Sequence, residues 1–261
     1  MSLTRERLFD IQNEQVEEWI RERLSDKGAG EDSEEWQDLL NQYSDYQEHL
    51  QDEFEWKAEV KWLKEEVKWL KENDLSYHHE KFFTELDALK NMAESNLENP
   101  NKVFMLHSNI VVKMSYAYAV TLLETFLGDT FKALIIKREN FLENAIKNVK
   151  EIKNARYSIF ELSKTDLNIC SLALSHTTGI HFHNISKVQK IYSHVLGIEL
   201  QLDISKVCKI TSLRHDIVHR NGYTKDGKPI ELDAQDFFQT IEDIKKFSSS
   251  LQEQINEILA E

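Results

Sequence analysis

The shortage of proline and glycine constrains the fold of this chain more than any other feature. Its 261 residues include only two prolines and seven glycines. Strand-and-turn architectures need more of both, because these residues supply the backbone conformations that reverse the chain. The sequence therefore predicts an all-α protein, long enough to form one large domain or two smaller ones with a buried core.

Charge divides the sequence into two parts. Residues 1–100 carry 12 Lys and Arg against 27 Asp and Glu, a balance of −15, whereas residues 101–261 carry 20 against 19, a balance of +1. All five tryptophans lie in the first part. The Asn-Pro-Asn segment at 99–101 coincides with the change, and Pro100 disfavours helix at the residue before it. We predict an acidic, tryptophan-rich helical region over 1–100 and a helical bundle over 101–261.

The acidic part contains a repeated motif, VKWLKE, at 60–65 and 67–72. It places apolar side chains at alternating spacings of four and three, which predicts one seam along a helix, widened by Trp62 and Trp69. The seam residues are Trp56, Val60, Leu63, Val67 and Leu70. We expect this seam to pack on its own domain or on a dimer mate, with a groove for a partner helix as the alternative. The acidic residues of this part are expected to form a solvated face. The alternative is that they mimic nucleic acid and cover a basic site.

Cysteine content and hydropathy indicate a cytoplasmic protein. Cys170 and Cys208 are the only cysteines and lack the CxxC spacing of zinc or redox sites. The N-terminus has no apolar core of a secretory signal. The most apolar run, 109–136, is expected to be a buried bundle helix and no membrane span, because charged residues interrupt it: Lys113, Glu124, Asp129 and Lys132.

The second part predicts about five helices and one tight turn. Capping residues and apolar periodicity indicate helices over 108–137, 140–155, 186–197, 203–222 and 233–259. Asp203 is the expected cap of the fourth helix, and Gly197 and Gly222 are the expected stops of the third and fourth. The Asp-Gly pair at 226–227 predicts a small hairpin. Residues 157–185 give no clear pattern.

The stretch SLRHDIVHRNG, residues 212–222, concentrates the side chains that carry chemistry. Arg214 and His219 are five residues apart, about 140° around a helix, and both can line a groove if the last turn loosens. A histidine that titrates near neutrality transfers protons, and a permanently charged guanidinium binds phosphate. These groups suit RNA cleavage: a base takes the 2′-hydroxyl proton, an acid protonates the leaving oxygen, and the cation stabilises charge on phosphorus. No metal or cofactor is needed.

One helix supplies only one such set, so a second copy is the expected completion. A two-fold dimer brings the same patch of both subunits together and forms a composite site. Residues 206–228 carry six Lys and Arg against two Asp, a balance of +4 in a chain of net charge −14. Binding to nucleic acid depends on such cations, so any RNA site must be local to this segment.

At RHDIVH the chain resembles HEPN domains (higher eukaryotes and prokaryotes nucleotide-binding), whose signature is Arg-x4-His. The turn-rich stretch after it, the last amphipathic helix and an earlier apolar helix carrying an acid, here Glu124, are also similar to this family. The resemblance covers residues 105–260. It implies a helical bundle that dimerises and, in many members, is a metal-independent endoribonuclease of bacterial defence, toxin-antitoxin systems or RNA processing. Some members bind nucleotides or serve only as structural modules.

The resemblance implies roles for particular residues. Arg214 and His219 match the signature, as the phosphate-binding cation and the acid/base group, and His215 matches the polar position and would orient the substrate. Glu124 needs a partner because an isolated buried carboxylate is costly, and Arg214 is the candidate. Apart from the resemblance, we expect Arg220, Asn221 and Lys225 to contact the substrate. The alternative for Arg220 and Asn221 is that they bind backbone or turn the chain. The expected partners are RNA, a second copy of the chain, and a protein partner or antitoxin at the N-terminal region.

Two other functions remain open. The sequence HDIVH places His215 and His219 four apart with an acid between them, similar to the HExxH motif of zinc proteases, and the HFH segment at 181–183 offers a further ligand. Alternatively the bundle is a non-catalytic dimerisation or protein-interaction module, whose acidic region docks a partner.

Overall fold

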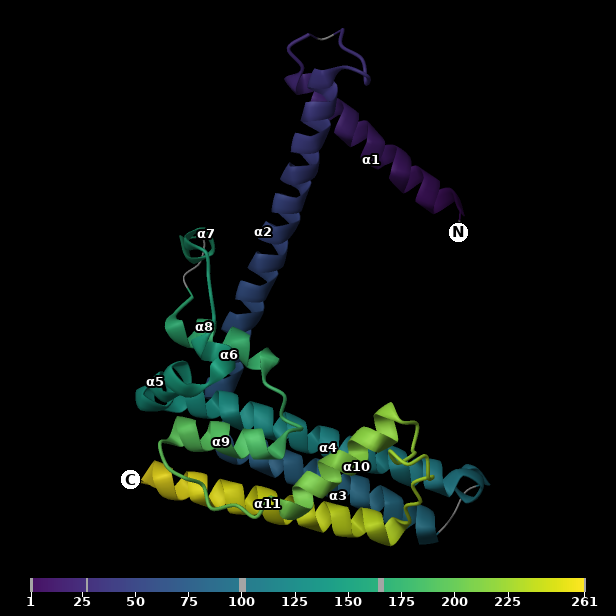
Figure 1. Ribbon diagram of the computed structural model, residues 1–261, viewed down its shortest axis with the longest axis vertical. Coiled ribbons are helices and arrows are strands. Elements are labelled where there is room, and N and C mark those ends of the chain that lie inside the picture. Colours follow the sequence, from purple (N-terminus) through teal and green to yellow (C-terminus); the bar gives the residue numbers. More distant parts are fainter. Residues whose placement is uncertain (1, 27, 99–101, 164–166, 261) are drawn as a thin grey trace. The chain divides into compact units, whose positions relative to one another are not determined.

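A computed structural model describes residues 2–26, 28–98, 102–163 and 167–260, and over these ranges the protein is all-α with no strand (Figure 1). The helices are α1 (Ser2–Arg23), α2 (Glu34–Glu72), α3 (Leu75–Glu98), α4 (Lys102–Lys137), α5 (Glu139–Asn148), α6 (Lys150–Lys153), α7 (Ile159–Ser163), α8 (Ile169–Ser175), α9 (Ile185–Leu196), α10 (Ser205–His219) and α11 (Ala234–Ala260), with a 3-10 turn over His176–Gly179. The predicted fold class is therefore confirmed at the level of an all-α helical bundle.

The chain forms two compact units, Met1–Trp62 and Leu63–Glu261, and the boundary between them falls within the residues of α2. The boundary predicted near residue 100 stays a prediction, since the Asn-Pro-Asn segment at 99–101 lies outside the described residues; the compact units themselves divide after Trp62. The reason is packing: α3 lies against α4 and α11, and Leu63 and Leu70 at the end of α2 belong to the same core. The acidic region thus contributes helices to the bundle, because apolar side chains of α2 and α3 are buried in its core.

The first unit has its own small core between α1 and α2. Its buried members are Ile20, Leu24, Trp36 and Leu39. Beside them Trp19 makes an edge contact with Tyr43, with ring centroids 5.3 Å apart, and the Arg23 guanidinium lies 4.0 Å from the Trp19 ring. Cation–π and aromatic contacts of this kind each contribute roughly 0.5–1.5 kcal/mol.

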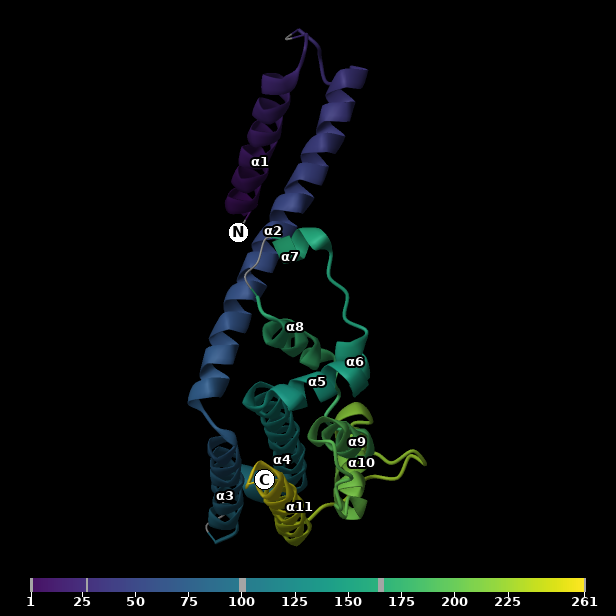
Figure 2. The same ribbon diagram turned by 90° about the vertical axis from the view of Figure 1, so that its left-hand side faces the viewer.

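The second unit is a bundle whose centre is α3, α4 and α11, which lie side by side in both views (Figures 1 and 2). The apolar face predicted for the last helix is confirmed: Phe237, Ile241, Ile244, Leu251 and Ile255 are buried and Ile258 is partly buried. Helices α5, α9 and α10 add further layers against α4 and α11. The core therefore follows the helical periodicity of the sequence.

Local signals predicted some helix ends and missed others. A non-helical residue, His107 (φ −131°, ψ 26°), interrupts α4, so its regular part lies close to the predicted 108–137. Helix α9 ends at Gly197, which has φ 76°, as predicted. The single helix predicted over 140–155 is wrong, because Val149 adopts an extended conformation and is 1 % exposed. Burial of this side chain separates α5 from α6.

The seam of the repeated motif is confirmed at its centre. Leu63 and Leu70 are buried, and Val67 packs partly against them. Trp69 is half-buried and makes an edge contact with His78, with ring centroids 5.2 Å apart. Trp62, in contrast, is 45 % exposed and does not widen the buried seam.

Helix α4 is apolar and long enough, by length and composition, to cross a membrane over residues 107–137. Half of its most apolar window is buried within the protein, where α4 packs against α3, α5, α10 and α11. Two of its charged residues pair inside the bundle: Lys132 Nζ lies 2.9 Å from Glu66 Oε1 and 3.7 Å from Asp129 Oδ1. These features are consistent with the core helix of a soluble protein.

Candidate functional site

Helix α10 carries the predicted site residues and is fixed to the core by its first half. The prediction that Asp203 caps this helix is wrong: the N-cap is Ile204, and Asp203, one residue earlier, accepts a hydrogen bond at Oδ1 from the backbone N–H of Ser205 (3.0 Å). Val207 and Ile210 are buried. The Tyr116 hydroxyl of α4 donates to the carbonyl oxygen of Ile210 (3.4 Å), and burial raises the pKa of this tyrosine. The buried residues and this hydrogen bond fix the first half of α10 to the core, and the second half, which carries the predicted site residues, continues from it.

The end of α10 is a tight reversal made by Asn221 and Gly222. Both have a left-handed backbone, with φ 54° and 80°. The backbone N–H groups of Arg220 and Gly222 both donate to the carbonyl oxygen of Asp216, at 3.1 and 3.3 Å. This geometry gives Asn221 a definite role in turning the chain, because asparagine tolerates positive φ better than most residues.

The predicted hairpin is present in a reduced form. The backbone N–H of Thr224 donates to the carbonyl oxygen of Lys228 (2.8 Å), and a single antiparallel bridge joins Tyr223 to Pro229. No strand extends from this bridge within the described part of the chain. The turn brings Lys225 and Lys228, both exposed, to the end of α10.

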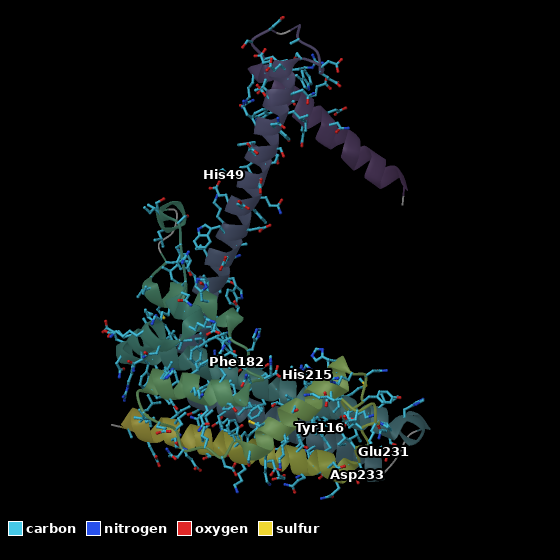
Figure 3. All side chains as sticks on the ribbon, in the orientation of Figure 1. His49, Tyr116, Phe182, His215, Glu231 and Asp233 are labelled. Carbon is cyan, nitrogen blue, oxygen red and sulfur yellow. The ribbon has the colours of Figure 1, made fainter. Side chains whose placement is uncertain are left out.

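His215 and His219 form an exposed pair near the end of α10. Their ring centroids are 4.7 Å apart and the ring planes are inclined by 44°. Both side chains are exposed, and Figure 3 shows His215 pointing away from the bundle. Arg214 is half-buried, and its Nε is buried without a hydrogen-bond partner among the described residues. One helix end therefore holds two solvent-accessible imidazoles and a partly sheltered guanidinium.

The expected ion pair between Glu124 and Arg214 is absent from the described residues. Glu124 Oε1 and Arg214 Nε are both buried without a partner. The helix crossing explains the separation: α4 meets α10 at Tyr116, which lies eight residues, or about 12 Å along a helix, before Glu124. Beyond this crossing α10 runs toward Lys113, further from Glu124. The acid on α4 therefore has no direct bond through which to position the guanidinium.

A cation that sequence reasoning missed lies beside the reversal. Lys113 of α4 packs against Gly222, where an added Cβ would lie 3.0 Å from Nζ. Two of the predicted cations are paired instead: Arg220 Nε lies 2.8 Å from Asp216 Oδ1, and Lys206 Nζ lies 2.6 Å from Asp243 Oδ1. The local positive charge is thus weaker at these positions than the sequence balance suggests.

The zinc alternative lacks a third ligand within one protomer. Across the described ranges no group of three or more His, Cys, Asp or Glu side chains is arranged to hold a metal ion. His181 and His183 are exposed with ring centroids 5.5 Å apart. Between them lies Phe182, which Figure 3 labels. Its ring packs against Gly128, where an added Cβ would lie 3.4 Å from the ring. This phenylalanine anchors the HFH segment to α4.

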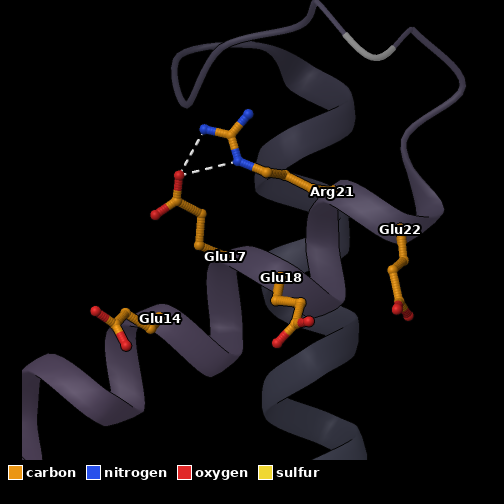
Figure 4. Close-up of a pocket in the computed structure, with 5 residues that line it drawn as sticks. All are labelled: Glu14, Glu17, Glu18, Arg21 and Glu22. Atoms are coloured by element: carbon orange, nitrogen blue, oxygen red, sulfur yellow. Dashed lines mark hydrogen bonds and ion pairs between the residues drawn. The ribbon is translucent and has the colours of Figure 1, made fainter.

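A hollow in the first unit is lined by α1 alone, through Glu14, Glu17, Glu18, Arg21 and Glu22 (Figure 4). The Arg21 Nε and Nη2 both donate to Glu17 Oε1, at 2.9 and 2.5 Å. Side chains that project from one exposed helix face do not enclose a ligand. This hollow is interpreted as part of the solvated acidic surface.

Comparisons with protein-family models, with curated proteins and with solved structures found no match to this chain. The resemblance to HEPN domains therefore depends on the residues of α10 and on the helical context described above.

Proposed function

We propose that the protein is a metal-independent endoribonuclease of the HEPN type, acting at a composite site between two copies of the chain. The observation that carries the proposal is the exposed His215–His219 pair, 4.7 Å between ring centroids, at the end of the helix that also holds Arg214. An exposed imidazole pair beside a guanidinium supplies proton transfer and charge stabilisation from one element.

The proposed roles follow the chemistry of each side chain. His219 transfers protons to and from the ribose 2′-hydroxyl and the leaving oxygen, with the second copy supplying the complementary acid or base. Arg214 stabilises the charge that develops on phosphorus through its permanently charged guanidinium. His215 orients the phosphate next to His219.

A second copy has a suitable surface close to this helix end. Ile110, Met114 and Tyr118 are spaced four apart on α4 and are 56, 67 and 53 % exposed. Val218 of α10 is 47 % exposed. Lys113 of α4, between the first two of these residues in sequence, packs against Gly222 at the end of α10, so the apolar stripe borders the site. Covering it with a second copy would remove apolar area from water and complete the set of catalytic groups.

The RNA backbone would follow the cations around the reversal. Lys225 is exposed at the turn, Lys113 lies beside Gly222, and Arg220 and Asn221 form the corner itself. Arg220 shares its charge with Asp216, so we expect it to contribute less to RNA affinity than Lys225.

Cleavage of labelled RNA in the presence of EDTA tests the proposal. We expect products with 2′,3′-cyclic phosphate ends, and a loss of about 100-fold or more in rate for Arg214→Ala and for His219→Ala, the usual scale for a removed acid/base group. Analytical ultracentrifugation should show that both variants remain dimeric.

Matched controls are His194→Ala on α9 and Arg156→Ala, which remove an exposed histidine and an exposed arginine from other parts of the unit. They should cleave like the wild type. Cleavage that requires a divalent metal, or that persists in the Arg214 and His219 variants, would contradict the proposal.

A non-catalytic interaction module is the second candidate, and the exposed stripe on α4 favours it independently of the histidines. In that case the stripe binds a partner protein, while no RNA is cleaved by the wild type. Met114→Glu should then abolish partner binding, whereas His219→Ala should leave it unchanged. In a toxin-antitoxin pair, the acidic N-terminal region would bind the protein that neutralises the toxin. In bacterial defence, it would bind another cytoplasmic protein of the defence system.

A further inference from the structure

The middle of α2, residues 41–59, is a stretch of helix without a buried side chain. It belongs to the first unit and is separate from the proposed nuclease residues. Most helical stability in proteins comes from the packing of an apolar face rather than from the propensity of the residues. A stretch of this length therefore gains stability from an element that packs on it.

One face of this stretch is apolar. Tyr46, Leu50 and Phe54 are spaced four apart and are 44, 38 and 73 % exposed, and we call these three residues the α2 stripe. The ring of Trp19 on α1 stacks on Tyr46, with ring centroids 6.1 Å apart, so α1 contacts the start of the stripe. Apolar residues at this spacing are typical of a helix face that packs on another helix.

Most acids of the stretch lie on the opposite side of the helix from the α2 stripe. At about 100° per residue, five of them lie about 140–180° around the helix from the centre of the stripe: Asp45, Glu48, Asp52, Glu55 and Glu59. Glu53 lies beside the stripe, and its Oε1 pairs with Lys57 Nζ at 3.1 Å. The corresponding position on the other side of the stripe is Gln47. The surroundings of the stripe are therefore close to neutral.

This charge pattern selects a second copy of the chain as the partner. A basic helix would find one carboxylate beside the stripe, that of Glu53, and Lys57 already pairs with it. Two identical stripes meet with their outer carboxylates on the far sides of two helices, each about 10 Å across. Salt screens charges at separations beyond about 8 Å at physiological ionic strength. A two-fold axis brings the same face of two subunits together.

We propose that the α2 stripe is a self-association surface, on which α2 of a second copy packs. This surface is distinct from the stripe on α4, and the inference does not rest on the nuclease activity. A contact along residues 41–59 is about 28 Å long and about 10 Å wide, or roughly 300 Å² per copy. Specific interfaces bury about 800 Å² per partner, so association through this surface alone is weak and depends on concentration.

Hydrogen exchange of the full-length chain, followed by mass spectrometry over residues 41–59, tests the proposal. The measurement is made in the Met114→Glu background, which removes the stripe on α4 as a second source of association. Raising the protein concentration from about 1 µM to about 1 mM should slow exchange of this stretch about tenfold or more, because packing on a second copy stabilises the helix. Phe54→Glu should abolish this dependence, because it puts a carboxylate of each copy at the contact.

Ile198→Glu is the matched control, because Ile198 is 45 % exposed after α9 and the substitution changes the net charge equally. It should keep the concentration dependence. Circular dichroism should show equal helix content in all variants, since Phe54 is exposed and glutamate favours helix.

Equal exchange of residues 41–59 at both concentrations would overturn the proposal, as would an equal concentration dependence in Phe54→Glu. Protection that appears only when an amphipathic peptide of leucine and lysine is added would also overturn it, and would assign the α2 stripe to a basic partner.

Discussion

Replacing Lys132 by methionine tests how the bundle accommodates charge in its most apolar helix. Lys132 Nζ bridges Glu66 Oε1 at 2.9 Å and Asp129 Oδ1 at 3.7 Å, and the three side chains are 20, 17 and 25 % exposed. Methionine retains most of the aliphatic volume, so the substitution removes the cation and leaves the packing. Glu66 and Asp129 then lose the lysine that they share, and His78 and Lys81 remain as the positive groups that act on Asp129.

The expected loss lies between two limits. Removing one partner of a fully buried pair costs about 3–5 kcal/mol, whereas an exposed pair contributes about 0.5 kcal/mol. Since roughly a fifth of each side chain reaches solvent, we expect Lys132→Met to lower the free energy of unfolding by about 2–3 kcal/mol.

The assay is urea unfolding of the full-length chain, followed by far-UV circular dichroism. Lys147→Met is the control, because Lys147 and Glu143 form an exposed pair on α5 with a Nζ–Oε2 distance of 2.8 Å. It should cost less than about 0.5 kcal/mol. Equal losses in the two variants would refute the reasoning.

The pH dependence of Lys132→Met provides a second readout. Burial already raises the pKa of Asp129, and Lys132 opposes that rise. Without the lysine the pKa of Asp129 rises further, so the folded state binds a proton more readily than the unfolded state does. The variant should therefore recover stability as the pH falls through this raised pKa.

Two further predictions concern a buried histidine and the reversal after α10. Burial lowers the pKa of His78 below its usual value of 6.5, so on acidification the unfolded state binds the proton before the folded state does. The free energy of unfolding should therefore fall as the pH drops from 6.5 toward the lowered pKa. Urea unfolding should show a smaller fall for His78→Asn, which lacks the titrating group. An equal loss in that variant would contradict this assignment. Gly222→Ala should lower the free energy of unfolding by about 1–2 kcal/mol, because Gly222 has φ 80°, a conformation that alanine adopts with strain. Gly179→Ala is the control, because its added Cβ meets only ordinary contacts, and thermal unfolding should show a smaller effect for it. Equal effects in the two variants would argue against backbone strain.

The sequence predicts a helix well where a local pattern, such as apolar periodicity or a terminal glycine, marks it. The apolar periodicity of α11 and the glycine that ends α9 each involve residues within a few turns of one another. The pair of histidines on α10 is likewise local, because residues four apart on a helix are neighbours. In contrast, the break at Val149 depends on the burial of one side chain in the surrounding core, which no local pattern reveals.

The sequence by itself determined that the chain is helical, which faces of α2 and α11 are apolar, and that Arg214, His215 and His219 share one helix. Only the tertiary structure decided that the compact units divide at Trp62, that Glu124 makes no bond to Arg214, and that Lys113 lies beside Gly222. It alone also showed that Tyr46, Leu50 and Phe54 stay exposed on α2. The physical reason is distance along the chain: helix formation and periodicity act over a few residues, whereas the crossing of α4 with α10 and the packing of α3 on α11 depend on how whole apolar faces fit together.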